Sequence, residues 1–248
     1  MISKIGIAIS TFSSVNTSEK RIEIIKKSLA SVKTAKGTSA VVVVVNDGST
    51  NKKHLAVLDE FRDSFDFIDF SSNKGISSAK NAGIKHLYDL GCDLMFIMDD
   101  DIQLIKGFDG FYANAIQRSG IHHFCYKVPE LNKHVVSKED RGGIKIIKTL
   151  QVNGAFFTLT KKLVDSVGYF KLLPYRYGHE HTEYTGRIIK MTTLCPGYVD
   201  VEGSSTYVKY IGLDDRSDNF PGIHDDLIKN NAKAAFSGEK AYVKYSIK

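Results

Sequence analysis

The sequence predicts an α/β protein with a Rossmann-like, mostly parallel central sheet flanked by helices. Strand-like and helix-like segments alternate through the first 98 residues, as in a chain of βαβ units. Two of the strand-like segments, residues 41–45 and 94–98, are uninterrupted apolar runs, which are typical of parallel strands buried on both faces. Of the 248 residues, 42% are hydrophobic and 25% charged, which suits a globular chain and excludes a disordered or collagen-like one.

Each element in the first half follows from a local pattern. Ile5, Ile7 and Ile9 alternate with smaller or polar residues, which predicts a strand. Apolar residues spaced by three or four, as on one face of a helix, predict the helices. In chain order the expected elements are strand 5–9, helix 19–36, strand 41–45, helix 55–65, strand 67–70, helix 77–90 and strand 94–98.

The pattern weakens beyond residue 101, where we expect a smaller extension of the sheet domain. The expected elements there are helix 108–119, extended segment 124–128, polar loop 132–143, extended segments 144–150 and 152–159, and a short helix over 161–167. No repeat, low-complexity tract or linker divides the sequence. We therefore expect one domain over residues 1–248, with halves at 1–105 and 106–248.

Apolar runs, the N-terminal pattern and the cysteines indicate the compartment in which we expect the protein. The longest apolar run, residues 40–45, is far shorter than the roughly 20 residues that a membrane span needs. The N-terminus leads into a strand rather than a signal-peptide pattern, so we expect a cytoplasmic protein. Three widely spaced cysteines indicate reduced packing residues rather than disulfides or a metal site.

The sequence is moderately basic, with 34 Lys and Arg against 28 Asp and Glu. Many of the basic residues fall within 20–36 and 229–248. We interpret them as a solvated basic face, with contact to lipid headgroups at a membrane surface or to nucleic acid left open.

Polar clusters follow three of the expected strands. They are Ser10-Thr11-Phe12, Asn46-Asp47-Gly48-Ser49 and Asp99-Asp100-Asp101. In open parallel sheets, ligands bind at the carboxyl ends of the strands, so these clusters predict a binding site there. Three adjacent carboxylates repel one another unless a cation offsets them, and a hard divalent ion that bridges to a diphosphate prefers such oxygen ligands.

These residues resemble a known family, the inverting nucleotide-sugar glycosyltransferases of the GT-A fold, and family 2 in particular. Val43–Thr50 is similar to the family's hhhVDDGS element, and Phe96–Asp101 is similar to its DxD element. Asn73–Gly83 is similar to its NxGxxxARNxG element, with Lys80 where arginine is usual. The resemblance covers about the first 105 residues. It implies that Asp47 reads the donor base, usually uracil, and that Asp99 and Asp101 contact the ribose and hold Mn²⁺ or Mg²⁺ on the diphosphate.

Taken residue by residue, the resemblance and the strand-end clusters yield two sets of candidates. The nucleotide-sugar-binding residues are Thr11, Asp47, Ser49, Asn73, Gly75, Lys80, Asp99, Asp100 and Gly154. The metal ligands are Asp99, Asp101 and His224, since many metal-dependent members of this fold supply a last ligand from a C-terminal histidine.

The second half matches the family more loosely, at 153–157, 167–170 and 177–184. The last of these segments normally carries the catalytic base as the Asp of a Glu-Asp pair, and here His181 stands at that position. Since imidazole and carboxylate can both accept the proton of an acceptor hydroxyl, the base candidates are His181, Glu180 and Glu183. A retaining reaction, and zinc binding by His179 and His181, stay open.

The function predicted is metal-dependent transfer of a hexosyl or related group from a nucleoside-diphosphate sugar, such as a UDP-sugar, to a hydroxyl acceptor such as a cell-envelope glycan, with inversion. One alternative keeps this chemistry on a polyanionic acceptor, such as phage DNA or teichoic acid. Another is an inactive module that binds sugar or nucleic acid. A nucleotidyltransferase is disfavoured because no glycine-rich phosphate loop follows the first strand. The sequence does not specify donor sugar, acceptor or oligomeric state.

Overall fold

The computed structural model describes residues 2–37, 39–130, 135–150, 154–174 and 177–212, together with Asn230 and Lys244. The elements are, in chain order, β1 (Ile5–Thr11), α1 (Glu19–Ala35), β2 (Val41–Asn46), α2 (Lys52–Asp59), β3 (Asp66–Asp69), α3 (Ile76–Asp89), β4 (Leu94–Asp99), β5 (Ile102–Leu104), α4 (Phe108–Ser119), β6 (Val135–Arg141), β7 (Ile144–Thr149), β8 (Phe156–Thr160), α5 (Lys161–Val167), α6 (Glu180–Met191), β9 (Tyr198–Val201), the 3₁₀ turn η1 (Ser204–Thr206) and β10 (Val208–Tyr210).

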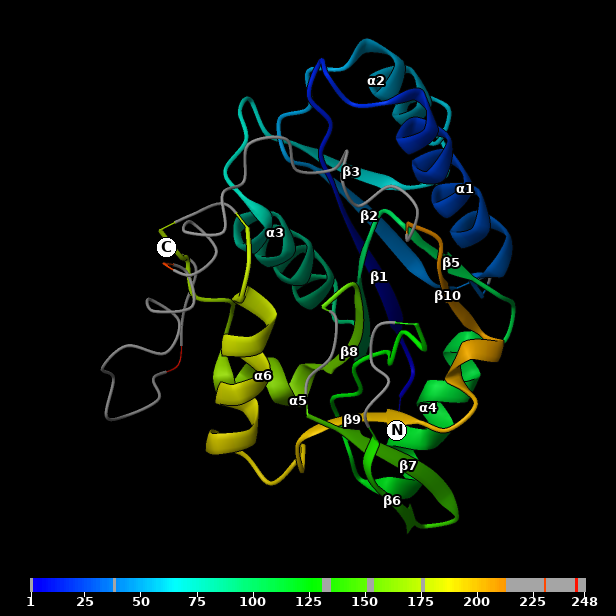
Figure 1. The fold of residues 1–248 in the computed structure, drawn as a ribbon, viewed down its shortest axis with the longest axis vertical. Coiled ribbons are helices and arrows are strands. Elements are labelled where there is room, and N and C mark those ends of the chain that lie inside the picture. Colours follow the sequence, from blue (N-terminus) through cyan, green and yellow to red (C-terminus); the bar gives the residue numbers. More distant parts are fainter. Residues whose placement is uncertain are drawn as a thin grey trace.

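A five-stranded sheet forms the centre of the molecule, in the order β3-β2-β1-β4-β8. The first four strands run parallel and β8 runs antiparallel to β4. Helices α1 and α2 lie on one side of the sheet and α3 on the other (Figure 1). The strand order reverses between β1 and β4, and ligands bind at this switch point in open α/β sheets.

The sheet is held by the apolar runs that predicted it. Val43, Val44 and Val45 of β2 are fully buried, as is every residue from Leu94 to Met98 in β4. Helix α3 packs closely against β1 because Gly83 faces Ala8, where an added Cβ would come within 2.7 Å of the Ala8 Cβ. Because α3 directly follows the parallel strand β3, its start lies at the carboxyl ends of the strands.

Two small sheets accompany the central one. Strands β6, β7 and β9 form one, in that order, and β5 and β10 form an antiparallel pair directly after the three aspartates. Helix α5 lies beside the edge strand β8, and α6 packs against α5 (Figure 1). One continuous set of buried apolar side chains includes residues of both halves, from Ile7 to Val208.

The mixed α/β architecture with a mostly parallel sheet confirms the predicted fold class, with some local corrections. The prediction of a polar loop over 132–143 was wrong for its larger part, because residues 135–141 form the exposed strand β6, which pairs with β7. Nearly all side chains of this strand are exposed, so no alternation of apolar and polar residues marks it in the sequence. Helix α2 ends at Asp59, short of the predicted 65, and β5, β9 and β10 had no clear sequence pattern.

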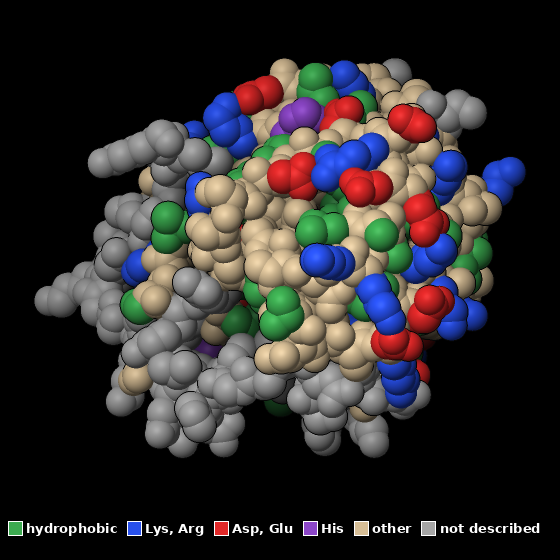
Figure 2. Space-filling view, turned by 90° about the horizontal axis from the view of Figure 1, so that it is seen from above, with side chains coloured by type: hydrophobic (Ala, Val, Ile, Leu, Met, Phe, Trp, Pro, Cys, Tyr) green, Lys and Arg blue, Asp and Glu red, His purple; other side chains and the backbone are tan. Residues whose placement is uncertain are grey.

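Charged side chains are mixed on the face that carries α1 and α2. Figure 2 looks down on this end of the molecule and shows Lys and Arg side chains interspersed with Asp and Glu. Several form exposed ion pairs, such as Lys26 with Glu60 and Arg62 with Asp59.

Among the described residues, no helix is long and apolar enough to cross a membrane. The three cysteines are buried free thiols.

A buried histidine links α6 to the central sheet. The Nδ1 of His123 donates to the Thr158 carbonyl of β8 at 2.8 Å, and its Nε2 lies 2.9 Å from the Thr185 hydroxyl of α6. Burial lowers the pKa of His123 to about 4, so the ring is neutral in the folded protein near pH 6. The side chain therefore acts as a neutral connector in the core.

His123 is expected to make stability sensitive to acid. The folded state holds its pKa near 4, while the unfolded chain titrates near 6.5, so its stabilising contribution is complete above pH 6.5 and is lost as the pH falls toward 4. Between pH 7 and 5.5 the wild type should lose about 1 kcal/mol of unfolding free energy relative to His123→Gln. Urea unfolding of both proteins at the two pH values measures this difference, and a constant difference would contradict a neutral buried imidazole.

Candidate functional site

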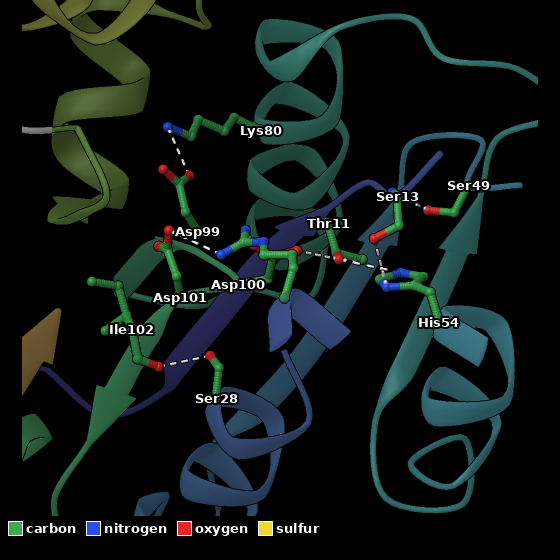
Figure 3. Close-up of polar contacts among 11 residues, drawn as sticks. Thr11, Ser13, Ser28, Ser49, His54, Lys80, Asp99, Asp100, Asp101 and Ile102 are labelled. Atoms are coloured by element: carbon green, nitrogen blue, oxygen red, sulfur yellow. Dashed lines mark hydrogen bonds and ion pairs between the residues drawn. The ribbon is translucent and has the colours of Figure 1, made fainter. Parts of the chain in front are cut away.

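The candidate site lies where the carboxyl ends of β1 and β4 are neighbours. The register pairs Ser10 with Asp99, so the three aspartates emerge beside Thr11. Asp100 and Asp101 are buried, whereas the Asp99 side chain is 28% exposed. Figure 3 shows the polar side chains of this region spread along the sheet edge from Lys80 to Ser49.

Arg21 of α1 neutralises two of the three aspartates. Its guanidinium donates to Asp100 Oδ1 through Nη2 and to Asp101 Oδ2 through Nη1, the latter at 3.2 Å. Burial alone would lower the arginine pKa, but the two carboxylates outweigh it and raise the pKa above its ordinary value. Arg21 therefore stays charged, although sequence analysis placed this part of the chain on a solvated basic face.

Two carboxylate oxygens in this cluster are buried without a hydrogen-bond partner among the described residues, Asp99 Oδ1 and Asp101 Oδ1. Asp99 Oδ1 forms an ion pair with Lys80, whereas the ion pair of Asp101 with Arg21 is made by its other oxygen, Oδ2. Burial raises the pKa of Asp101 to about 7, against the opposing effect of Arg21. A buried, unpartnered carboxylate oxygen next to the partly exposed Asp99 is a donor set that fits a hard divalent cation.

The geometry supplies only part of a coordination shell. Across the described ranges, no three Asp, Glu, His or Cys side chains are grouped closely enough to hold a metal ion. Asp99 faces Lys80 and Asp101 faces Arg21, so the two expected ligands point to different cations. The third expected ligand, His224, lies outside the described residues.

Lys80 joins the two halves of the site. From α3, its Nζ lies 3.2 Å from Asp99 Oδ1 and 3.6 Å from Glu180 Oε1, and it donates to the Gly154 carbonyl at 3.1 Å. The side chain is 1% exposed. Burial would lower the pKa of Lys80, but the two carboxylates raise it overall, so the ammonium stays charged. The end of β4 and the start of α6 thus share one buried cation.

The start of α6 holds the three candidate bases in different surroundings. Glu180 is buried beside Lys80, and its pKa is lowered because Lys80, His181 and backbone amides outweigh the effect of burial. Glu183 forms a buried bidentate pair with Arg187, at 2.9 and 3.0 Å. His181 is only partly buried and lies against Gly154, where an added Cβ would collide with its ring.

The residue before this helix has an uncommon backbone conformation. His179 has φ +63°, the only positive value among the non-glycine residues that the structure describes. Such conformations are enriched at functional sites, where the surroundings hold a strained turn in place. Here the turn sets the direction in which α6 begins.

Asp47 organises the loop that begins α3. Its two carboxylate oxygens accept from the amides of Lys74 and Gly75, at 2.7 and 2.9 Å. Gly48 has φ +72°, and an added Cβ there would collide with the backbone of Ser72 and Asn73. Asn73 keeps a buried Oδ1 without a partner among the described residues. These contacts bring two of the expected donor-binding elements together.

Two further residues of this region escaped sequence analysis. Arg21 is spaced four, seven and eleven residues from Ile25, Ser28 and Val32, so a helical wheel places it on the buried stripe of α1. His54 in the first turn of α2 is fully buried and contacts Thr11 and Ser13. Nothing in the sequence around His54 distinguishes it from a surface histidine.

The family element around Asn81 has a structural role. The Asn81 side chain donates to the Phe170 carbonyl at 2.9 Å and accepts from the Phe170 amide at 2.7 Å. Arg187 similarly donates to the carbonyls of Val167 and Tyr169. Both contacts fix the segment before α6 against the rest of the molecule.

The expected residues are thus only partly gathered. The described contacts connect Thr11 with Asp100, Ser49 with Ser13, Asp47 with Gly75, and Lys80 with Asp99, Gly154 and Glu180. Glu183 faces Arg187 instead of this group.

Two solved structures share this fold at low sequence identity. A mannosyltransferase from Pyrobaculum calidifontis, in complex with GDP-Man and Mn²⁺, matches with a TM-score of 0.56 and 14% identity over 75% of this chain and 52% of its own. S. aureus TarS 1–349 in complex with UDP matches with a TM-score of 0.54 and 16% identity over 75% of this chain and 55% of its own. This chain therefore spans about half the length of either solved protein.

Comparison of sequences finds a relative that is more similar to this chain than these two solved proteins are. An uncharacterized glycosyltransferase of Acanthamoeba polyphaga mimivirus is 38% identical over 218 residues, which cover 86% of this chain and 84% of the relative. The model of the family described as glycosyl transferase family 2 matches residues 15–173. This range contains the strand-end aspartates, Lys80 and Asp47, and ends just before α6. The chain is therefore a glycosyltransferase with the GT-A fold and belongs to glycosyl transferase family 2.

Proposed function

We propose that the protein transfers a sugar from a nucleoside-diphosphate sugar, with UDP as the first candidate nucleotide, to a hydroxyl acceptor with inversion and with a divalent metal ion. The observation that carries the proposal is the position of Lys80 between Asp99 and Glu180, at 3.2 and 3.6 Å. One buried ammonium links the strand-end carboxylates, which would receive the donor, to the helix start that carries the candidate bases. Donor and acceptor chemistry would thus meet at one point.

The donor would lie along the carboxyl ends of β1, β2 and β4. The loops held by Asp47 and Ser49 would contact the nucleoside, and Asp99 would contact the ribose. The same region is bordered by Thr11, Asn73, Gly75 and Gly154. The buried Asp100 would hold Asp99 and Asp101 in position through its contact with Thr11. The two solved proteins of this fold contain GDP-Man and UDP, which is consistent with such a donor.

Asp99 and Asp101 would hold Mn²⁺ or Mg²⁺, with His224 as a third ligand. The unpartnered Asp101 Oδ1 supports this assignment. When bound, the ion would offset negative charge on the departing diphosphate.

His181 is the base that this site favours. Glu180 is engaged by Lys80 and Glu183 by Arg187, and a carboxylate with a lowered pKa or in a bidentate ion pair is a poor proton acceptor. The partly exposed imidazole of His181 would take the acceptor hydroxyl proton while the oxygen attacks the anomeric carbon from the face opposite the diphosphate. Residues 106–248 would supply the acceptor side of the site.

Release of nucleoside diphosphate tests this proposal without a known acceptor, because water can replace it slowly. UDP-, GDP-, CDP- and dTDP-sugars are incubated with the wild type and Mn²⁺, Mg²⁺ or chelator. We expect release from one donor, loss of release with chelator, and loss in Asp101→Asn, while the matched control Asp63→Asn at an exposed site retains it. Release that is unaffected by chelator and by Asp101→Asn would contradict the metal assignment.

The class of acceptor needs a separate experiment. A cell-envelope glycan acceptor is proposed, and a polyanionic acceptor would show a steep loss of binding as the salt concentration rises. Binding that changes little between about 50 and 200 mM salt would contradict a polyanionic acceptor.

A further inference from the structure

A row of buried polar side chains leads to Asp100, one of the strand-end aspartates. It consists of Ser13, His54, Thr11 and Asp100, each at most 3% exposed. Figure 3 shows the row crossing from the end of β1 to the first turn of α2 on one side and to β4 on the other. Buried groups of this kind are costly unless their hydrogen bonds are satisfied in a definite direction.

The direction of these hydrogen bonds follows from the chemistry of the groups. Asp100 Oδ2 accepts the hydroxyl proton of Thr11. A hydroxyl has only one proton, so Thr11 Oγ1 can take part in its second contact, with His54 Nε2 at 3.3 Å, only as an acceptor. His54 therefore carries its proton on Nε2.

The other ring nitrogen then has a lone pair. Burial, together with the charge of Arg21, lowers the pKa of His54 to about 4, so the imidazole holds a single proton near neutral pH. The lone pair of Nδ1 accepts from the Ser13 hydroxyl at 3.1 Å. Ser13, His54 and Thr11 thus each donate in turn toward Asp100.

This row connects both parts of the proposed donor site. At one end, the Ser13 amide donates to Ser49 Oγ at 3.0 Å, and the Ser13 carbonyl accepts from the amide of Thr50. At the other end, Asp100 shares Arg21 with Asp101. The orientation of His54 therefore fixes the loop after β2 and the aspartates after β4 relative to each other.

We propose that His54 is a positioning residue for the donor site, which as the Nε2-H tautomer orients Thr11 and thereby holds the Asp100–Arg21–Asp101 cluster in its donor-binding arrangement. This inference rests on the proposed function. It assigns His54 no contact with substrate. Its effect is therefore expected in donor affinity more than in the chemical step.

Three substitutions separate hydrogen bonding from filling of space. His54→Gln can place an amide N–H near the position of Nε2, His54→Asn reaches only the position of Nδ1, and His54→Phe fills the space without either bond. The probe is the one of UDP, GDP, CDP and dTDP that the wild type binds best with Mn²⁺, and its dissociation constant is measured together with kcat, KM and Tm. His86→Gln, at a partly exposed position of α3 where the imidazole contacts Asp66, is the matched control.

We expect the dissociation constant to rise about tenfold in His54→Phe and His54→Asn, the loss of roughly one hydrogen bond, and to change less than threefold in His54→Gln and His86→Gln. The KM for the donor sugar nucleotide should rise in the same variants as the dissociation constant. If the role is only packing, His54→Phe should bind the nucleotide as tightly as the wild type does. The dissociation constants of the other two variants should then rise only as far as their Tm values fall. This result would overturn the inference.

The tautomer is tested on the wild-type protein, which removes any dependence on variants that fold poorly. Long-range ¹H–¹⁵N NMR spectra should show the proton of His54 on Nε2. A proton on Nδ1 would overturn the inference while leaving the proposed function intact. A wild type that binds none of the nucleotides with metal would instead overturn the proposed function, and this inference with it.

Discussion

Replacement of Arg21 by methionine should lower the free energy of unfolding by about 3–5 kcal/mol, the range for removal of one partner from a buried charge pair. The substitution keeps much of the side-chain volume but removes the positive charge that faces Asp100 and Asp101. Both carboxylates are buried, so water cannot replace the guanidinium. The protein must then either bury uncompensated negative charge or protonate both groups, and each course costs stability.

Urea or thermal unfolding measures this effect, and Arg62→Met is the matched control. Arg62 makes two ion pairs as well, with Asp59 and Asp69, but its side chain is 40% exposed. Each exposed pair contributes at most about 1 kcal/mol, so the control, which loses two pairs, should lose no more than about 2 kcal/mol. Equal losses in Arg21→Met and Arg62→Met would show that Arg21 is not the main counter-charge of the aspartates. Arg21→Lys should lie between them, since it keeps the charge but not the forked geometry.

The second large effect is expected at Lys80. Lys80→Met should lower the rate of sugar transfer, or of donor hydrolysis, at least about 100-fold, because small displacements of reacting groups cost this much. Without the ammonium, Asp99 and Glu180 repel each other across the site and the Gly154 carbonyl loses its donor. The start of α6, with His181, would then move relative to β4.

Lys85→Met is the control for this experiment. It makes the same substitution on the same helix, where Lys85 forms an exposed pair with Asp89. Steady-state kinetics and Tm of both variants, with Lys80→Arg as a charge-conserving change, separate a loss of charge from a loss of folding. We expect Lys80→Arg to retain more activity than Lys80→Met. If Lys80→Met turned over donor at the wild-type rate, Lys80 would not be the link between the two halves of the site.

Much of the fold was predictable because it depends on local periodicity. The apolar runs of β2 and β4 and the stripes of α1 and α3 are strong patterns, and burial of these faces determines which elements pair. The polar strand β6 was not predictable in this way. Its residues are exposed, and what defines the strand is its pairing with β7 rather than any apolar face.

The sequence by itself determined that polar residues follow β1, β2 and β4, and topology then places them at one edge of the sheet. Only the tertiary structure decided which partners they face: the charges of Arg21 for Asp100 and Asp101 and of Lys80 for Asp99 and Glu180, and the neutral imidazole of His54 for Thr11. Most of these partners are 43 to 100 residues apart in the sequence, so no local sequence pattern could predict that they meet. The physical reason is that a charged side chain becomes buried only where packing brings a counter-charge to it, and that depends on the whole fold.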